Sequence, residues 1–269
     1  MHVRLLHTGP LDGPTNMALD DALLAHARAT GELVVRVYTW ATPTLSFGRH
    51  QRAAGVYDPE RLAARGVAVV RRPTGGRAVL HAREVTYSVA APAGALAPAN
   101  ASVRASHARI NAMLVAALGT LGVCARVAAP AGRAPRPDAA PCFEVPTGGE
   151  LVVGEGDDAR KLVGSAQWQA DGALVQHGSI LVDDDQSRVA DFAVHALPPV
   201  PVPATLHAAL GRAPLVDEVA AAIFGAAGCL GAGHAPTVTP LDADARASID
   251  AAAARLRPHY ADPAWTWRR

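Results

Sequence analysis

The chain has 269 residues, half of them apolar, so it can bury a substantial core as one large domain with or without a small appendage. Its formal net charge of +1, without long runs of like charge, argues against a nucleic-acid-binding protein with a concentrated basic stripe. Three widely separated cysteines, no signal peptide and no apolar run near the roughly 20 residues of a membrane span predict a cytoplasmic, non-membrane protein with reduced thiols.

The first quarter of the chain reads as helices alternating with short strands. A run rich in alanine and leucine predicts the first helix, with Thr15 as its cap. Two β-branched and aromatic runs then predict a hairpin or two adjacent strands. The elements expected here are a helix over 16–29, strands over 33–40 and 44–48, a helix over 58–65 and a strand over 67–70.

A segment rich in arginine and glycine, Arg71-Arg72-Pro73-Thr74-Gly75-Gly76-Arg77, leads into an extended segment that contains His81. The two glycines free backbone N–H groups to face a ligand, and the arginines can pair with an anion. The alternative is an ordinary hairpin turn with exposed arginines. The arginines beside the glycines favour a binding site, to which the adjoining His81 is also assigned.

The middle of the chain alternates featureless and patterned segments. Residues 91–99 and 128–141, rich in alanine and proline, are expected to be loops. Between them, apolar residues recur at helical spacing from about 102 to 121. Three strands in a meander are expected over 151–153, 161–167 and 173–182.

Lys161 is the only lysine in a chain that otherwise uses arginine as its cation. Such a bias would have replaced a lysine that served only as a solvated charge, so we interpret Lys161 as a residue whose ammonium group has a specific function. Small residues and hydrogen-bond donors on its strand and the next one could hold a carbonyl or carboxylate. The substrate-binding candidates there are Gly164, Ser165, Ala166, Gln167, His177 and Gly178.

Cys142 stands 19 residues before Lys161, directly after the proline-rich segment 128–141. A lone cysteine is more often a small buried apolar residue than a nucleophile. A nearby ammonium, however, favours the thiolate over a thiol whose reference pKa is about 8.5. Cys142 and Lys161 are therefore the predicted catalytic pair for acyl transfer. Cys124 and Cys229 lie within apolar stretches and are expected to be structural, and no metal-ligand spacing occurs.

The C-terminal part follows a stiff proline-rich segment over 197–203. Residues 204–269 are interpreted as a small helical appendage packed on a main domain of residues 1–203. Helices are expected over 215–227 and 241–256, the second capped near Asp242 and ended before Pro258.

Two segments resemble the signatures of the lipoate/biotin protein ligase catalytic-domain family: the one from Arg71 to His81 and the one from Lys161 to Gln167. Asn16-Met17-Ala18-Leu19-Asp20 and the segment from Trp40 to Arg49 are similar to that family's opening helix and first strands. The resemblance covers about residues 1–190. It implies an α/β (α+β) fold, a mixed, largely antiparallel sheet flanked by helices, with the site on one face of the sheet.

Within this family, the Gly-Arg-Gly-Arg-type loop of biotin ligases is missing. Pro141-Cys142-Phe143-Glu144 and the run from Gln176 to Leu181 are similar to the branch of LipM-type octanoyltransferases. That resemblance implies an enzyme without a cofactor. Its donor would be octanoyl acyl carrier protein, and its acceptor a lipoyl domain of glycine cleavage H protein or of a 2-oxoacid dehydrogenase E2.

Three other functions stay open on the sequence. The first is an ATP- and magnesium-dependent lipoate ligase that works through an acyl-adenylate, in which Arg72, Gly75 and Gly76 surround the adenylate and Cys142 is incidental. The others are an amidotransferase between two lipoyl domains and a non-catalytic acyl-binding protein.

Overall fold

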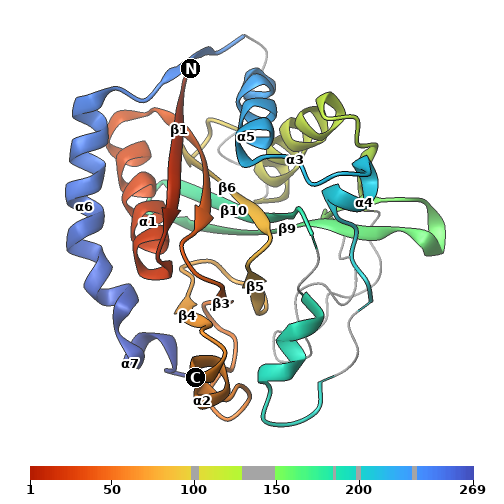
Figure 1. Cartoon of the computed structure of the whole chain (residues 1–269). Helices are drawn as coiled ribbons and strands as arrows, with labels where there is room; N and C mark the ends of the chain where they lie inside the picture. The colour runs from red at the N-terminus through yellow and green to blue at the C-terminus, as the bar shows by residue number, and fades with distance from the viewer. Residues whose placement is uncertain (98–102, 129–148, 184–185, 198–200, 232–234) are drawn as a thin grey trace.

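The computed structural model describes residues 1–97, 103–128, 149–183, 186–197, 201–231 and 235–269 (Figure 1). The predicted α/β fold is confirmed, because a large mixed sheet is flanked by helices on both faces. In this sheet the strand order is β11-β1-β2-β6-β10-β9-β8-β7, and a second sheet has the order β4-β3-β5. The edge formed by β11, β1 and β2 is parallel, whereas all other pairs in the large sheet are antiparallel.

The large sheet consists of β1 (His2–Leu11), β2 (Leu33–Trp40), β6 (Glu84–Pro92), β7 (Ala125–Val127), β8 (Leu151–Val153), β9 (Arg160–Ala170), β10 (Ala173–Leu181) and β11 (Thr237–Pro240). The small sheet consists of β3 (Thr44–Phe47), β4 (Ala68–Arg71) and β5 (Val79–His81). The α-helices are α1 (Gly13–Thr30), α2 (Pro59–Ala64), α3 (Val103–Thr120), α4 (Leu206–Leu210), α5 (Val216–Gly225), α6 (Ala243–Ala261) and α7 (Pro263–Thr266). Short 3-10 helices cover Gly156–Asp158, Gln186–Phe192 and Ala227–Leu230.

Two apolar cores lie on opposite faces of the large sheet. On one face, α3 and α5 pack their buried apolar residues against the central strands. On the other face, α1 lies on the sheet and α6 packs along α1 (Figure 1). A third apolar cluster joins the small sheet to the 3-10 helix Gln186–Phe192. Val70 of β4 belongs to the same apolar cluster as α1, so the small sheet stands beside the α1 face of the large sheet.

Several elements differ from the expectations. The runs 33–40 and 44–48 do not pair, because β2 belongs to the large sheet and β3 lies between β4 and β5 in the small one. The first helix begins at Gly13 and is capped by Asp12, whose carboxylate accepts from the backbone N–H of Thr15 at 2.8 Å. Short-range signals do not decide which distant strand completes a sheet. Asp12, three residues before Thr15, provides the better cap because its carboxylate reaches a free backbone N–H of the first turn.

The C-terminal part is helical, as expected, but it also adds β11 to the large sheet beside β1. The helix α6 continues through Pro258 to Ala261. A proline inside a helix costs about 3 kcal/mol, and the packing of α6 on α1 offsets that cost, with Tyr260 buried and bonded to Asp21 at 2.9 Å. The boundary proposed at residue 203 stays a prediction. Among the described helices, none has the length and apolar character needed to span a bilayer.

Arg71 fastens the C-terminal residues to the small sheet. Its buried guanidinium donates to the carbonyl oxygens of Thr266 at 2.9 Å, Gly48 at 2.6 Å and Gln51 at 2.8 Å. The indole of Trp265 donates back to the carbonyl of Arg71 at 3.0 Å. Burial, followed by the neighbouring arginine charges, lowers the pKa of Arg71 to about 10, so the group stays charged at neutral pH.

Replacing Arg71 by methionine is expected to lower the free energy of unfolding by about 3 kcal/mol, because it leaves several buried carbonyl oxygens without a donor. Urea denaturation followed by circular dichroism measures the effect. Arg65→Met is the matched control, since the Arg65 side chain is 56% exposed in its ion pair with Asp191 and should change stability by less than about 0.5 kcal/mol. Equal stability of the Arg71 variant and the wild type would show that this arginine does not clamp the C-terminal residues.

Candidate active site

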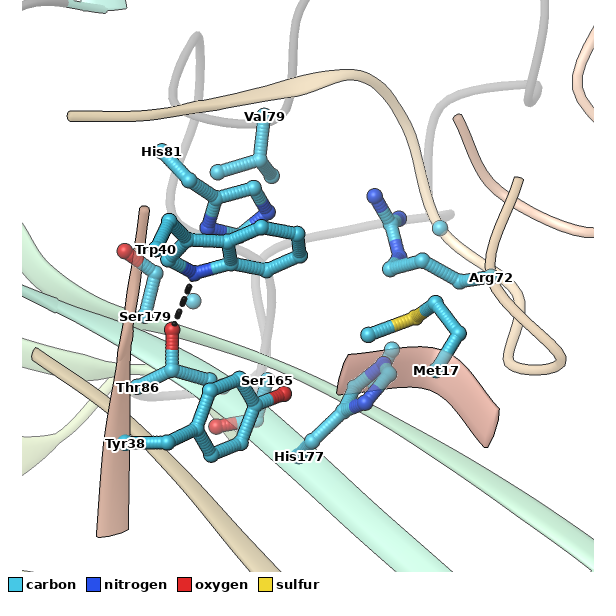
Figure 2. Close-up of a pocket in the computed structure, with 14 residues that line it drawn as sticks. Met17, Tyr38, Trp40, Arg72, Val79, His81, Thr86, Ser165, His177 and Ser179 are labelled. Carbon is cyan, nitrogen blue, oxygen red and sulfur yellow. Dashed lines mark hydrogen bonds between the residues drawn. The ribbon is translucent and has the colours of Figure 1, made fainter. Parts of the chain in front are cut away.

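A pocket lies between α1, the small sheet and the central strands of the large sheet (Figure 2). It holds about 410 Å³ of space not filled by atoms, part of it open to solvent. Of the residues predicted from the sequence, those that line it are Arg72, Gly76, His81, Gly164, Ser165, Ala166, His177 and Gly178. The residues that sequence reasoning did not assign to the site are Met17, Tyr38, Trp40, Val79, Thr86 and Ser179.

Asp20 of α1 is the buried centre of the polar network under this pocket. Its carboxylate accepts hydrogen bonds from Arg36 at 2.8 Å, Tyr38 at 3.1 Å, Ser88 at 2.9 Å and the Nδ1 of His177 at 2.8 Å. Burial alone raises the pKa of Asp20, but the His177 hydrogen bond and the Arg36 charge outweigh it, so the net pKa is lowered. Asp20 is therefore an ionised carboxylate that joins α1 to three strands of the large sheet.

His177 connects Asp20 to the glycine-rich segment. Because the ionised carboxylate can only accept, Nδ1 of His177 carries a proton, and its Nε2 lies 2.6 Å from the hydroxyl of Thr74. Thr74 is fully buried and does not itself line the pocket. The chain Asp20–His177–Thr74 thus fixes the segment 71–77 against β10. The sequence singled out His177, whereas Asp20 entered only as the last residue of the Asn16–Asp20 segment and was not assigned to the site.

Arg72 shapes the glycine-rich segment from within. One of its terminal nitrogens donates to the carbonyl and hydroxyl oxygens of Ser46, at 2.8 and 2.6 Å. The other donates to the carbonyl oxygens of Arg77 at 2.9 Å and Gly75 at 3.1 Å. These bonds hold the turn that presents Gly76 to the pocket. Gly48 lies against this turn so closely that a Cβ there would come 1.9 Å from the carbonyl oxygen of Gly76, which excludes any side chain at position 48.

His81 and Trp40 form a flat wall of the pocket. Their rings stack with centroids 4.1 Å apart at an angle of 18°, and the indole N–H of Trp40 donates to Thr86 at 2.9 Å (Figure 2). The hydroxyl of Ser46 accepts from Arg72 and lies 2.6 Å from Nε2 of His81. Burial, and then the charge of Arg72, lowers the pKa of His81 against the opposing effect of Glu84. The imidazole is thus neutral at pH 7.

Lys161 is buried, but it does not line this pocket. Its ammonium lies 2.5 Å from the carboxylate of Glu150. Gly164, three residues farther along β9, does line the pocket, so its Cα lies about 10 Å from that of Lys161 at the usual rise of a strand. The other predicted residues outside the lining are Arg71, Thr74, Gly75, Arg77 and Gln167. Gln167 bonds to Ser106 of α3 at 3.0 Å, on the opposite face of the sheet.

Cys142 lies outside the described residues. The described residues that flank residues 129–148 lie side by side, because the backbone N–H of Ala128 donates to the carbonyl of Glu150 at 2.8 Å. Glu150 also forms an ion pair with Lys161, so both flanking residues lie near this lysine. Cys124 and Cys229, expected to be structural because they lie within apolar stretches, are both exposed, so neither is a core residue. Cys124 precedes the edge strand β7 and Cys229 sits in a 3-10 helix, where one side of each backbone faces solvent.

Replacing Asp20 by asparagine is expected to cost about 3–5 kcal/mol of unfolding free energy at pH 7, because it leaves Arg36 as a buried charge without its counter-ion. The folded-state pKa of Asp20 is lowered from its unfolded value of about 3.9, so its ionic contribution is complete above that value. The contribution disappears as the pH falls through the lowered pKa. Urea denaturation at several pH values should show a constant difference between wild type and variant above about pH 5 that shrinks below about pH 4.

The neighbouring Asp21 is the control for this pH dependence. Its pKa is raised by burial, against the hydrogen bond from Tyr260, so its ionisation opposes folding as the pH rises. Asp21→Asn should therefore gain stability relative to the wild type with increasing pH, opposite to Asp20→Asn. Parallel trends in the two variants would exclude the assigned charge state of Asp20.

Comparisons with known proteins place this chain in a family. The Lipoyl protein ligase A/B catalytic domain matches residues 12–227. Proteins named Octanoyltransferase LipM are similar to the chain. The one from Kyrpidia tusciae is 46% identical over 200 residues, which cover 72% of this chain and 70% of the relative. The one from Moorella thermoacetica is 42% identical over 182 residues (66% of this chain, 64% of the relative), and the one from Staphylococcus aureus is 37% identical over 197 residues (71% of this chain, 69% of the relative). The chain thus spans about two thirds of the length of these relatives.

Solved structures share the fold over the whole chain. A putative lipoate protein ligase from T. acidophilum superposes with a TM-score of 0.76 at 20% identity, covering 100% of both chains. A lipoate-protein ligase A bound with ATP superposes with a TM-score of 0.72 at 21% identity, covering 99% of both chains. The match of the catalytic domain to most of the sequence, together with these relatives, shows that the chain belongs to the lipoyl protein ligase A/B catalytic-domain family.

Proposed function

We propose that this protein is an octanoyltransferase of lipoate biosynthesis, which moves octanoate from acyl carrier protein to the lysine of a lipoyl domain. The observation that carries this function is the 37–46% identity to proteins named Octanoyltransferase LipM. The likeness to ligase structures, at 20–21% identity, concerns the fold alone. The pocket supports the proposal because Met17, Val79 and the Trp40–His81 stack offer an apolar surface to an acyl chain.

Cys142 is the proposed nucleophile of a two-step reaction. Its thiolate attacks the thioester carbonyl of the donor, the new S–acyl bond forms as the old one breaks, and the carrier leaves as a thiolate. The lysine amine of the lipoyl domain then attacks the acyl-enzyme, forming the amide and releasing the Cys142 thiolate, and the proton that the amine loses passes through solvent to the carrier thiolate. Cys142 is seven residues from Gly149. A fully extended chain of that length spans about 25 Å, so the Cα atoms of the two residues are no farther apart than that.

Lys161 is the proposed second catalytic residue, polarising the acyl carbonyl and favouring the Cys142 thiolate. Its buried ion pair with Glu150 supports this role, because the charge-assisted hydrogen bond to the carboxylate holds the ammonium in one position. The glycine-rich segment fixed by Arg72 is proposed to hold the acyl group between the two sheets. No cofactor is required for either step.

One pair of assays separates this function from an ATP-dependent ligase. Protein is mixed with an apo lipoyl domain and either octanoyl acyl carrier protein or free octanoate with ATP and magnesium, and the mass of the lipoyl domain is followed. The transferase octanoylates the domain only from the carrier thioester, and Cys142→Ser prevents it. Ligation of free octanoate or lipoate that survives Cys142→Ser would replace the transferase with the ligase. Octanoyl transfer from a loaded H protein but not from the carrier would instead indicate an amidotransferase.

A further inference from the structure

Three arginines gather on the surface beside the pocket, although the whole chain has a net charge of only +1. Arg49 comes directly after Gly48 at the end of β3, and Arg268 and Arg269 follow α7. Arg268 and Arg269 are exposed and Arg49 is half-buried. Figure 1 shows the C-terminal residues beside α2 and the small sheet. We call Arg49, Arg268 and Arg269 the arginine cluster.

Hydrogen bonds and a ring contact hold the arginine cluster together. The backbone N–H groups of Ala53 and Ala54 donate to the backbone oxygen of Arg269, the last residue of the sequence, at 2.7 and 2.6 Å. The guanidinium of Arg268 donates to the carbonyl of Arg49 at 2.6 Å and lies 3.9 Å from the ring centre of Trp265. These contacts hold the backbone of Arg269 and the guanidinium of Arg268 beside Arg49.

The like charges in the arginine cluster act on one another. Burial, and then the charges of Arg49 and Arg269, lowers the pKa of Arg268. Among the described residues, no aspartate or glutamate side chain forms an ion pair with any of the three arginines, since the ion pairs of the other arginines use different partners. The nearby Asp21, whose pKa burial raises and the charge of Arg49 helps to lower, accepts a hydrogen bond from Tyr260. Like charges held together repel, and an anionic partner relieves that repulsion while steering its own approach.

The arginine cluster adjoins the wall of the pocket. The backbone N–H of Arg49 donates to the carbonyl of Thr74 at 2.7 Å, inside the glycine-rich segment. Gly48, the residue before it, packs directly on Gly76, which lines the pocket. An anion bound to the cluster would therefore lie one backbone layer from the space proposed for the acyl group.

We propose that the arginine cluster is the docking surface for the carrier protein that delivers the octanoyl thioester, and this inference rests on the proposed octanoyltransferase function. An acyl carrier protein is acidic and presents its acyl group on an arm that contains a phosphate, whereas the acceptor is a lysine side chain. Arginine binds phosphate and carboxylate groups with paired hydrogen bonds. The cluster thus matches the donor by charge and by chemistry.

The test compares the wild type with Arg268→Gln/Arg269→Gln in steady-state kinetics. The double variant is expected to raise the KM for octanoyl carrier protein about tenfold or more at low salt, with kcat changed by less than about twofold. Its KM should also lose the salt dependence seen in the wild type. The KM for an uncharged octanoyl N-acetylcysteamine thioester and the KM for the lipoyl domain should stay unchanged. Arg104→Gln/Arg126→Gln, which removes two exposed charges on the α3 side, is the matched control.

Direct binding separates this inference from the proposed function. Fluorescence anisotropy of labelled octanoyl carrier protein measures docking to the Cys142→Ala protein with or without the arginine substitutions, whether or not transfer occurs. Binding that is equal with and without Arg268 and Arg269, or weakened equally by the control substitutions, would overturn the docking surface. A raised KM for the lipoyl domain alone would assign the surface to the acceptor and also overturn it. Normal docking without octanoyl transfer in the wild type would refute only the proposed function.

Discussion

Replacing Cys142 by alanine is expected to abolish the octanoyl adduct on the protein and to lower the transfer rate at least about a thousand-fold. Exchange between two thioesters is nearly balanced in energy, so the wild type should accumulate one octanoyl group when the carrier is present and no acceptor amine is available. Intact-mass measurement after incubation with octanoyl acyl carrier protein checks this directly. An enzyme that forms an acyl-adenylate has no reason to acylate a thiol.

The other two cysteines supply the controls for the adduct. Cys124 and Cys229 are both exposed, so they are the thiols that would react without specificity. Cys124→Ala and Cys229→Ala should form the adduct as the wild type does, and hydroxylamine or apo lipoyl domain should remove it. An adduct that maps to either exposed cysteine, or none on folded protein, would end the cysteine mechanism.

Replacing Lys161 by alanine is expected to lower the transfer rate by hundreds-fold, since a group that stabilises the developing charge on an acyl oxygen contributes about 3 kcal/mol. The structure adds a second effect. Glu150, whose side chain is only 11% exposed, loses the ammonium that lies 2.5 Å away, so the variant should also lose stability by about 2–4 kcal/mol. Single-turnover mass measurements of transfer and urea denaturation record the two effects separately.

A second substitution separates catalysis from stability. In Lys161→Met/Glu150→Gln neither partner of the ion pair carries a charge, so much of the lost stability should return while the rate stays low. Glu150→Gln alone should keep more activity than Lys161→Met, because the ammonium remains. Near-normal turnover in a folded Lys161→Met protein would refute the role of Lys161, and recovery of activity in the double variant would assign the defect to misfolding.

The candidate site was only partly predictable from the sequence. Gly76, Arg72 and His81 could be found because glycines and arginines that stand within a few positions of each other indicate a segment that can present backbone N–H groups and positive charge to a ligand. Trp40 and Ser46 could not be assigned, because their roles depend on contacts with residues 35–46 positions away. Nothing in residues 44–48 themselves indicates that they join a second sheet.

The sequence by itself determined the family, the central meander β8–β9–β10 and the residues whose chemistry is unusual, such as the single lysine. These properties are local, because periodicity, glycine placement and motif spacing act over one element at a time. Only the tertiary structure decided that Asp20 anchors His177, 157 residues away, and that Lys161 pairs with Glu150 outside the pocket. These two ion pairs form because a buried charge must be paired with a counter-ion, and which charges are buried together is decided by the packing of the whole chain.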